Sequence, residues 1–489
     1  FLPLKEKFRL AACSKDLESR VHVQPRQMAK YFNNIGYKTK NLVIKPNTFY
    51  IEYPELRWDT FVIDFSKDLL EFELPYANEI LTIKFSSLHD IQKFKTRFKD
   101  SKARVLLVVK EDFEMLRGFE YAKSINEVEI GLRDTNEPSG RDKGVCVFIS
   151  ELLSSTSVKY IKAEVIDKPE ILQMISRSLP PTIKHIEIHA PTSALILYDV
   201  FENLKAFRIE SLTLIASRII GFSYDDFKVL ESLNHLHFSE KNSRRDGCIF
   251  NAISQMNVIS ASINMKVRMS TLITDYIINS KLQKLKLSNL RLTEDEKVDL
   301  ARILTKKDLK ELELESMNVK PEYFANYLRF SSLTSLVIFE YSSTLEITDN
   351  FIASLIDSKV NHLEINRVKW TNKDLLLQIK RILLHSKLKH VVLDFEYSYT
   401  PTNVDDVIEI RNNYFENIIQ FFREIGNSLD AVQFKKAVIK FKGINILQSE
   451  QKKLLSRTTS ILNSIHISGP LPQFTIDMQR SILMLTFTK

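Results

Sequence analysis

Apolar residues recur in one pattern through the central part of the chain. The clearest copy spans residues 282–293 and reads LQKLKLSNLRLT, that is L-x-x-L-x-L-x-x-L-x-L-T. The alternation at its centre is typical of a short strand with one buried face. Val298, Leu300, Ile303 and Leu304 follow at helical spacing. Each copy therefore predicts a strand and a helix that covers it.

The same unit repeats along most of the chain. The second apolar residue of each copy serves as its reference residue, and these are Val128, Ile161, Ile186, Phe207, Leu236, Ala261, Leu285, Leu312, Leu336, Leu363, Val391, Val432 and Ile465. Eight of the twelve intervals between them lie between 24 and 29 residues, a length typical of a leucine-rich repeat made of strand and helix. One unit cannot bury its apolar face alone, so stacked neighbours must share a core.

These repeats predict an α/β fold, a leucine-rich-repeat solenoid with a curved parallel sheet and outer helices, over residues 123–489. Residues 22–122 are interpreted as a linker with degenerate repeats, because short strands at 42–44, 61–65, 81–85 and 105–109 again alternate with helical stretches. A short helical N-terminal segment, residues 1–21, precedes them. The alternative is an ordinary α/β domain, whose strands are usually continuous apolar runs joined by glycine-rich turns. The sequence shows neither feature.

The turn after each strand departs from the common leucine-rich repeat. Many such repeats place Asn three residues after the third apolar strand residue, where it bonds the turn. Here that position carries Leu290, Met317, Tyr341 and Val368. We therefore expect apolar side chains to pack these turns. In this respect the chain resembles, in divergent form, the longer intracellular repeats of the ribonuclease-inhibitor-like type.

Composition argues against several classes of protein. Only 10 of the 489 residues are glycine, and phosphate-binding loops and nucleophile elbows depend on glycine. No G-x-G-x-x-G, G-x-x-x-x-G-K-[ST] or G-x-S-x-G motif is present, which argues against nucleotide-dependent chemistry and an α/β-hydrolase. The net charge of +8 is smaller than that of a dedicated nucleic-acid-binding protein. Basic clusters at 93–104 and 435–442 are best explained as a solvated surface; an acidic or phosphorylated segment could also bind there, whereas a nucleic-acid partner is not expected.

The cysteines and the apolar runs indicate a compartment. Cys13, Cys146 and Cys248 lie far apart, so we predict reduced thiols, and neither a disulfide framework nor a cysteine zinc site. No apolar run approaches the roughly 18 residues of a membrane span, so no membrane partner is expected. A cytoplasmic or nuclear location is the simplest interpretation.

Strand positions that point away from the core line the concave face of a solenoid, the usual partner surface. The candidate substrate-binding residues at these positions are His235, His237, Lys284, Lys286, Glu311, Glu313, Val337, Phe339, His362 and Glu364. Lys284 and Lys286 should form ion pairs with Glu311 and Glu313 across neighbouring strands, although surface pairs of this kind are often merely solvated. Val337 and Phe339 place apolar groups where polar ones are expected, either to anchor a partner or to contact the next repeat.

The sequence contains no recognisable catalytic or metal-binding motif. His235 and His237 share one strand face, but no cysteine or carboxylate follows at zinc-site spacing. We find no H-E-x-x-H motif and no nucleophile beside a recognisable base. The sequence therefore predicts neither an enzyme, nor a metal site, nor a cofactor.

The N-terminal segment carries a second resemblance. Residues 1–17 read FLPLKEKFRLAACSKDL, which resembles the C-terminal half of an F-box. The positions that match the family in order are Leu2, Glu6, Arg9 and Leu10, with Cys13-Ser14 in place of the usual Val-Cys, Lys15 at a basic position and Leu17 in place of an aromatic. The match covers about 4% of the chain, and the opening helix of the motif is absent. That helix is expected upstream of Phe1, in agreement with a sequence that does not begin with Met.

An F-box directly before leucine-rich repeats is the order found in F-box/leucine-rich-repeat proteins. The resemblance implies a substrate-recognition subunit of an SCF-type (cullin–RING) E3 ubiquitin ligase. Its F-box would bind the Skp-type adaptor of the cullin complex, its repeats would bind a protein substrate, and the candidate adaptor-binding residues are Leu2, Leu4, Phe8, Leu10 and Cys13. The alternative is an adaptor-independent repeat scaffold or inhibitor, in which the N-terminal helices only cap the solenoid.

Overall fold

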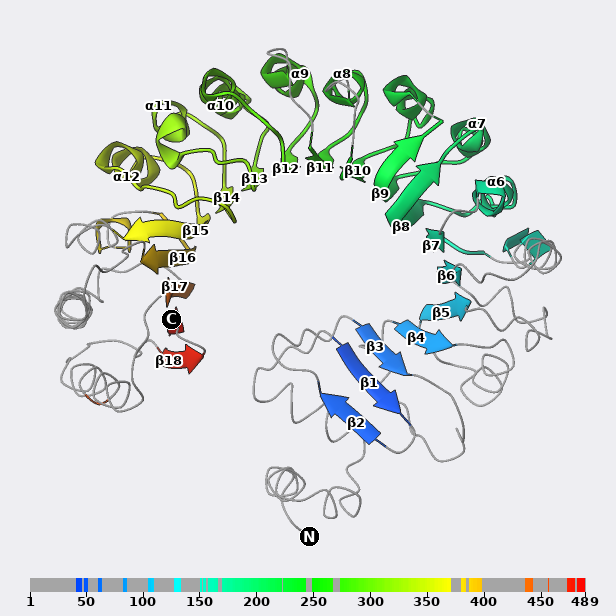
Figure 1. Cartoon of the computed structure of the whole chain (residues 1–489), viewed down its shortest axis with the longest axis horizontal. Coiled ribbons are helices and arrows are strands. Elements are labelled where there is room, and N and C mark those ends of the chain that lie inside the picture. The colour runs from blue at the N-terminus through cyan, green and yellow to red at the C-terminus, as the bar shows by residue number, and fades with distance from the viewer. Residues whose placement is uncertain are drawn as a thin grey trace, which may run out of the picture. The chain divides into compact units, whose positions relative to one another are not determined.

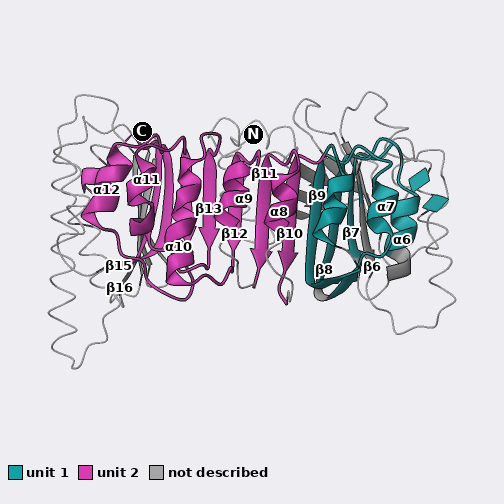
Figure 2. Ribbon diagram, turned by 90° about the horizontal axis from the view of Figure 1, so that it is seen from above, with its two compact units in different colours: residues 1–232 teal, residues 233–489 magenta. Residues whose placement is uncertain are grey.

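The structure is a computed structural model of residues 1–489. It describes residues 150–397 except 152, 155, 156, 166–168, 222, 243–248, 267–272, 371–379 and 384–386, together with 41–45, 48–51, 60–63, 82–85, 104–109, 127–132, 436–442, 456, 473–479 and 482–488. The chain divides into two compact units, Phe1–Ser232 and Leu233–Lys489 (Figure 2).

Parallel strands in chain order form the sheet of the second unit. They are β10 (His235–Glu240), β11 (Ser260–Met265), β12 (Lys284–Ser288), β13 (Glu311–Glu315), β14 (Ser335–Phe339), β15 (His362–Trp370), β16 (His390–Tyr397) and β17 (Lys436–Lys442). The connecting helices are α8 (Ile249–Ser254), α9 (Ile273–Asn279), α10 (Glu294–Leu300), η5 (Ala301–Thr305), η6 (Pro321–Phe324), α11 (Ala325–Leu328) and α12 (Asp349–Ile356). In Figure 1 helices α8 to α12 lie outside the arc of β10 to β15. The predicted α/β leucine-rich-repeat fold is confirmed.

The core of this unit lies between the strands and the helices. Leu285, Leu312, Leu336 and Leu363 occupy successive strands in register, and all four are fully buried. Each such side chain contributes roughly 1.5–3 kcal/mol when it leaves water. Because every repeat offers the same apolar row to its neighbour, the stack of strands shares one continuous core.

The first unit contains a similar parallel array and a separate small sheet. The array comprises β4 (Thr82–Phe85), β5 (Arg104–Val109), β6 (Glu127–Leu132), β7 (Tyr160–Val165), β8 (His185–Ile196) and β9 (Ser211–Ile220), with α6 (Pro169–Arg177), α7 (Val200–Leu204) and η4 (Tyr224–Val229) after the last three strands. The small sheet pairs β1 (Asn41–Lys45) with β2 (Thr48–Ile51) antiparallel and with β3 (Thr60–Ile63) parallel. Parallel repeats thus extend back to β4, whereas β1 to β3 do not follow the repeat pattern.

Two reference residues need correction. The repeat pattern predicts a strand at Phe207, but β9 begins at Ser211, and Leu212 is the residue in register with Ile186. Phe207 lies in the turn after α7, where its backbone N–H donates to Leu204. At the other end, Ala437 on β17 pairs with Val391. Ala437 is therefore the reference residue of this strand, in place of the predicted Val432. The predicted Val432 and Ile465 lie outside the described residues.

The second unit ends with strands of the opposite direction. β19 (Ile482–Thr488) pairs antiparallel with β17, and β18 (Gln473–Gln479) pairs antiparallel with β19. This end therefore differs from the continuous parallel solenoid that the sequence predicted to residue 489. The predicted boundaries at residues 21 and 122 remain predictions.

Turns that lead from strand to helix use left-handed backbone at non-glycine residues. Asn289 and Ser316, directly after β12 and β13, have φ of 61° and 54°, and Arg367, at the register irregularity within β15, has φ of 51°, a conformation that usually favours glycine. Burial of the next residue stabilises these turns: Leu290, Met317 and Val368 are all buried, as predicted.

Tyr341 does not follow that prediction, because its side chain is 61% exposed. Leu345 is buried in its place and forms a bridge with Val368. The apolar residue comes later here because the chain makes a longer turn before it reaches α12.

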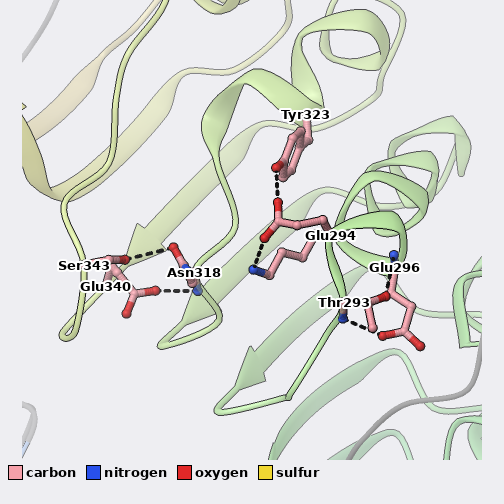
Figure 3. Close-up of polar contacts among 8 residues, drawn as sticks. Thr293, Glu294, Glu296, Asn318, Tyr323, Glu340 and Ser343 are labelled. Atoms are coloured by element: carbon pink, nitrogen blue, oxygen red, sulfur yellow. Dashed lines mark hydrogen bonds and ion pairs between the residues drawn. The ribbon is translucent and has the colours of Figure 1, made fainter.

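Glu340 connects the turns of two neighbouring repeats (Figure 3). Its buried carboxylate accepts a 2.5 Å hydrogen bond from the backbone N–H of Asn318 in the preceding repeat. It also accepts bonds of 3.0 Å from the Tyr341 N–H, and of 3.1 and 2.9 Å from the Ser342 N–H and hydroxyl. Ser343 adds a 2.9 Å hydrogen bond to Asn318. A single buried acid thus satisfies polar groups on both turns.

Helix α10, which follows β12, begins with a capping box. Thr293 Oγ1 accepts from the Glu296 N–H at 3.3 Å, and the Thr293 N–H donates to Glu296 Oε2 at 2.7 Å (Figure 3). Glu294, in the same first turn, binds Lys297 at 2.7 Å and accepts a hydrogen bond from Tyr323 of the next repeat. The acidic first turn also suits the positive end of the helix dipole.

Turns that lead from helix back to strand use a buried serine. Ser358 Oγ donates to the Leu355 carbonyl at 2.7 Å and accepts from the Val360 N–H at 3.2 Å. Ser280 and Ser331 make the same two bonds in their own repeats. A hydroxyl that both donates and accepts suits this position, because it bonds a helix carbonyl three residues before it and the backbone N–H two residues after it.

Candidate functional site on the strand face

The strand face is the surface of β12 to β16 opposite the helices of the second unit. All ten predicted substrate-binding residues occupy outward strand positions of this unit, where His235, Lys284 and Glu311 are exposed and the other seven are half-buried. The register brings eight of them together on β12 to β15. His235 and His237 lie apart, because β11 with Ser260 and Ser262 separates them from Lys284 and Lys286.

Two lysines on β12 meet three glutamates on β13. Lys284 Nζ lies 2.6 Å from Glu311 Oε1, and Lys286 Nζ lies 2.6 Å from Glu313 Oε1 and 2.9 Å from Glu315 Oε2. Both predicted ion pairs therefore form, between residues directly opposite in the parallel register. Exposed pairs of this kind contribute at most about 1 kcal/mol each, so their main consequence is to fix the direction of the side chains.

Lys286 and Glu315, two half-buried members of this cluster, are held in their charged forms. Burial lowers the pKa of Lys286, but its bonds to Glu313 and Glu315 outweigh burial, and the pKa lies above its usual value. For Glu315, burial raises the pKa and Lys286 more than offsets this, so the pKa is lowered. Ser288 and Tyr341 also donate to Glu315, at 3.1 and 3.3 Å. Lys286 and Glu315 therefore stay charged near neutral pH.

An apolar strip follows the charged cluster. Val337 lies between Glu313 on β13 and Glu364 on β15, and Phe339 lies beside Glu315. Both apolar side chains are half-buried. The exposed Tyr341, whose hydroxyl donates a hydrogen bond to Glu315, belongs to the same strip. Sequence reasoning missed Tyr341 as a surface residue, although the longer spacing to the next apolar turn residue, Leu345, was a usable signal.

Two histidines lie side by side next to this strip. His362 on β15 and His390 on β16 are in register, with ring centroids 6.0 Å apart. Within the part of the chain that the structure describes, no three His, Cys, Asp or Glu side chains gather as a metal site.

A separate polar cluster lies on the strands of the first unit. Glu187 on β8 accepts a 2.7 Å hydrogen bond from the Tyr160 hydroxyl of β7, and its Oε1 lies 2.6 Å from His189 Nε2. The contact with His189 lowers the pKa of Glu187 most, and Tyr160 lowers it further against the effect of burial, to about 2.

The candidate adaptor-binding residues Leu2, Leu4, Phe8, Leu10 and Cys13 lie outside the described residues. The basic residues of 93–99 do so too. Among the helices that the structure describes, none is long and apolar enough to cross a lipid bilayer.

Comparisons with known proteins give structural neighbours only. No family model matches the chain, and no curated protein matches it. An internalin (inlF) from Listeria monocytogenes aligns at 14% identity over 60% of this chain and 81% of its own, with a TM-score of 0.38. The leucine-rich-repeat ectodomain of the plant receptor kinase GASSHO1/SCHENGEN3 from Arabidopsis thaliana aligns at 11% identity, with a TM-score of 0.27. That alignment covers 65% of this chain and 45% of the ectodomain, so this chain spans about half of that neighbour's length.

Proposed function

We propose that this chain is a non-catalytic protein-recognition subunit whose strand face binds a protein partner. The observation that carries the proposal is the strand face itself. Neighbouring parallel strands present charged, apolar and imidazole side chains in one fixed register. A rigid surface of this kind can match both the charge and the shape of another protein.

The more specific proposal is a substrate receptor of an SCF-type (cullin–RING) E3 ubiquitin ligase. It is supported by the resemblance of residues 1–17 to an F-box and by their position before the repeats. Leu2, Leu4, Phe8, Leu10 and Cys13 would contact the Skp-type adaptor, and the strand face would hold the substrate. Such a receptor supplies binding, while the rest of the complex supplies the chemistry.

Adaptor binding tests the more specific proposal. The full-length native protein is mixed with a purified Skp adaptor, and the complex is measured by size-exclusion chromatography and calorimetry. We expect a one-to-one complex that Leu10→Asp abolishes, because a charge at an apolar contact is costly to bury. Ser19→Asp adds the same charge outside the matched positions and should leave the complex intact.

If a well-folded protein forms no complex, the adaptor-independent scaffold or inhibitor replaces the ligase receptor. Recognition by the strand face is tested separately, by comparing proteins captured from cells by wild-type, Val337→Arg and Val298→Arg. Val298 is an exposed residue of helix α10 and serves as the matched control. Partners should be lost only in Val337→Arg; an unchanged set would contradict the assignment of the strand face.

A further inference from the structure

A row of exposed bases follows the edge where the strands of the second unit begin. Its members are Lys281, Lys307, Lys310, Arg329, Lys359 and Lys389, called the basic edge below, and all six side chains are exposed. They come from the successive helix-to-strand turns that precede β12 to β16. Because these strands are parallel, their amino ends meet at one edge of the sheet. The same turns hold only two exposed acids among the described residues, Asp308 and Asp357.

Backbone hydrogen bonds fix the spacing of this edge. The N–H of Thr334 donates to the Lys310 carbonyl at 2.8 Å, that of Asn361 to Thr334 at 2.9 Å, and that of Lys389 to Asn361 at 2.7 Å. Each bond joins one repeat to the next. Lys310 and Lys389 are therefore three strand steps apart, roughly 14 Å at about 4.8 Å for each step.

The bases of this edge are not neutralised within the described part of the chain. None of the six forms an ion pair there, whereas Lys284 and Lys286 on the strand face are both paired. Lysines at a helix C-terminus can be explained by the helix dipole. Lys310 and Lys389 instead stand immediately before their strands, so the dipole does not account for them.

An exposed aromatic ring lies in the middle of the row. Phe330, in the turn before β14, is 82% exposed. The guanidinium carbon of Arg329 lies 5.7 Å from the centroid of its ring. A large apolar side chain this exposed gains nothing for the fold, but it can anchor an apolar group of a partner.

We propose that the basic edge and Phe330 together bind an extended acidic polypeptide segment that carries an apolar side chain. Carboxylates spaced along such a segment would meet the lysines, and its apolar residue would cover Phe330. A single-stranded nucleic acid fits less well, because such sites offer successive aromatic rings for base stacking, whereas the described residues of this edge offer one exposed ring, that of Phe330. Five of the six bases are also lysines, which lack the bidentate fork that arginine offers to phosphate. This surface is distinct from the strand face, and the proposal stands without the function proposed above.

Fluorescence anisotropy tests the proposal with a labelled probe peptide of about 14 glutamates interrupted by one central leucine. We expect saturable binding to the whole chain that weakens as salt is added. The double variant Lys310→Glu/Lys389→Glu should weaken binding about tenfold or more, and Phe330→Ala about threefold. Removing the leucine from the probe should weaken binding to wild-type but not to Phe330→Ala.

The matched control is Lys241→Glu/Lys369→Glu. Both lysines are exposed and lie near the carboxyl ends of β10 and β15, so the net charge changes equally. Equal losses in the two double variants would mean that the probe responds only to overall charge, and the proposal would be wrong. Tighter binding of poly-uridine RNA, lost in the same variants, would instead assign the edge to nucleic acid. The single variant Phe330→Ala keeps the test decisive if charge reversal disturbs the fold.

Discussion

Glu340 shows how one side chain can decide the geometry of a turn. Its carboxylate is 1% exposed and accepts hydrogen bonds from Asn318, Tyr341 and Ser342. We predict that Glu340→Ala lowers the free energy of unfolding by about 3 kcal/mol, since hydrogen bonds to a charged group contribute about 1.5–3 kcal/mol each. Glu340→Gln keeps one acceptor oxygen and should lose about half as much.

Chemical denaturation of purified variants measures these differences. The exposed Glu346, in the same turn, provides the control, and Glu346→Ala should change stability by less than about 0.5 kcal/mol. A Glu340→Ala variant as stable as this control would show that water replaces the carboxylate without loss.

Glu187 makes the stability of its neighbourhood depend on pH. Its pKa is about 2 in the folded protein against an ordinary 4.5, so the ionised form is favoured by folding. This contribution is fully present above about pH 4.5 and is lost as the pH falls toward 2. We predict that wild-type exceeds Glu187→Gln in stability at about pH 6, and that the gap narrows at about pH 3.

Urea unfolding at the two pH values, monitored by a signal from the first unit, would measure the difference in stability between wild-type and Glu187→Gln. Glu164→Gln, an exposed acid on the adjoining strand β7, should show no such narrowing. If the gap for Glu187→Gln were the same at both pH values, the contacts with His189 and Tyr160 would not favour the ionised carboxylate.

At the scale of the element, a buried serine links the end of the helix to the residues before the next strand in three repeats, at Ser280, Ser331 and Ser358. Removing the Ser358 hydroxyl leaves the buried Val360 N–H without its acceptor. We predict that Ser358→Ala lowers the free energy of unfolding by about 1–2 kcal/mol. Ser332→Ala, at a half-buried position beside Ser331, should change it by less than about 0.5 kcal/mol. Thermal and urea unfolding of both variants provide the measurement, and equal stabilities would rule out this role.

The strands of the second unit could be predicted because apolar alternation and cross-strand register have the same physical cause. One-sided burial places Leu285 and Leu312 inward, and this fixes Lys286 and Glu313 outward and opposite each other. The strand at Phe207 was wrongly predicted because Leu204, Phe207 and Ile209 also match the L-x-x-L-x-L spacing of the repeat. Only the hydrogen bonds of the turn distinguish that run from a strand.

Contacts that depend on turn length could not be predicted in the same way. Tyr341 occupies the position of a buried turn residue, yet a longer turn gives that role to Leu345. The buried role of Glu340 was equally hidden, since an acid after a strand usually faces water. The antiparallel end was missed because strand direction leaves no mark on the alternation of apolar residues.

For the molecule as a whole, repetition means that the stability of each repeat depends on its contacts with the neighbouring repeats. Leu336 is fully buried in the middle of the second unit, and truncating such a leucine costs about 2–5 kcal/mol. Since a repeat contacts mainly the repeats beside it, we predict that Leu336→Ala weakens β13, β14 and β15 most. Hydrogen exchange followed by mass spectrometry should show the loss of protection there and little change in β8 of the first unit. Uniform loss through both units would show that they unfold as one.

The reversed strands at the end of the second unit bear on self-association. A stack of parallel strands offers at its last edge a template that another copy could extend without limit. In this chain β19 occupies that edge of β17 with the opposite polarity, and β18 covers β19 in turn. Strand β19 bonds the edge of β17, and its reversed direction interrupts the parallel order that a fibre of stacked copies would have to continue.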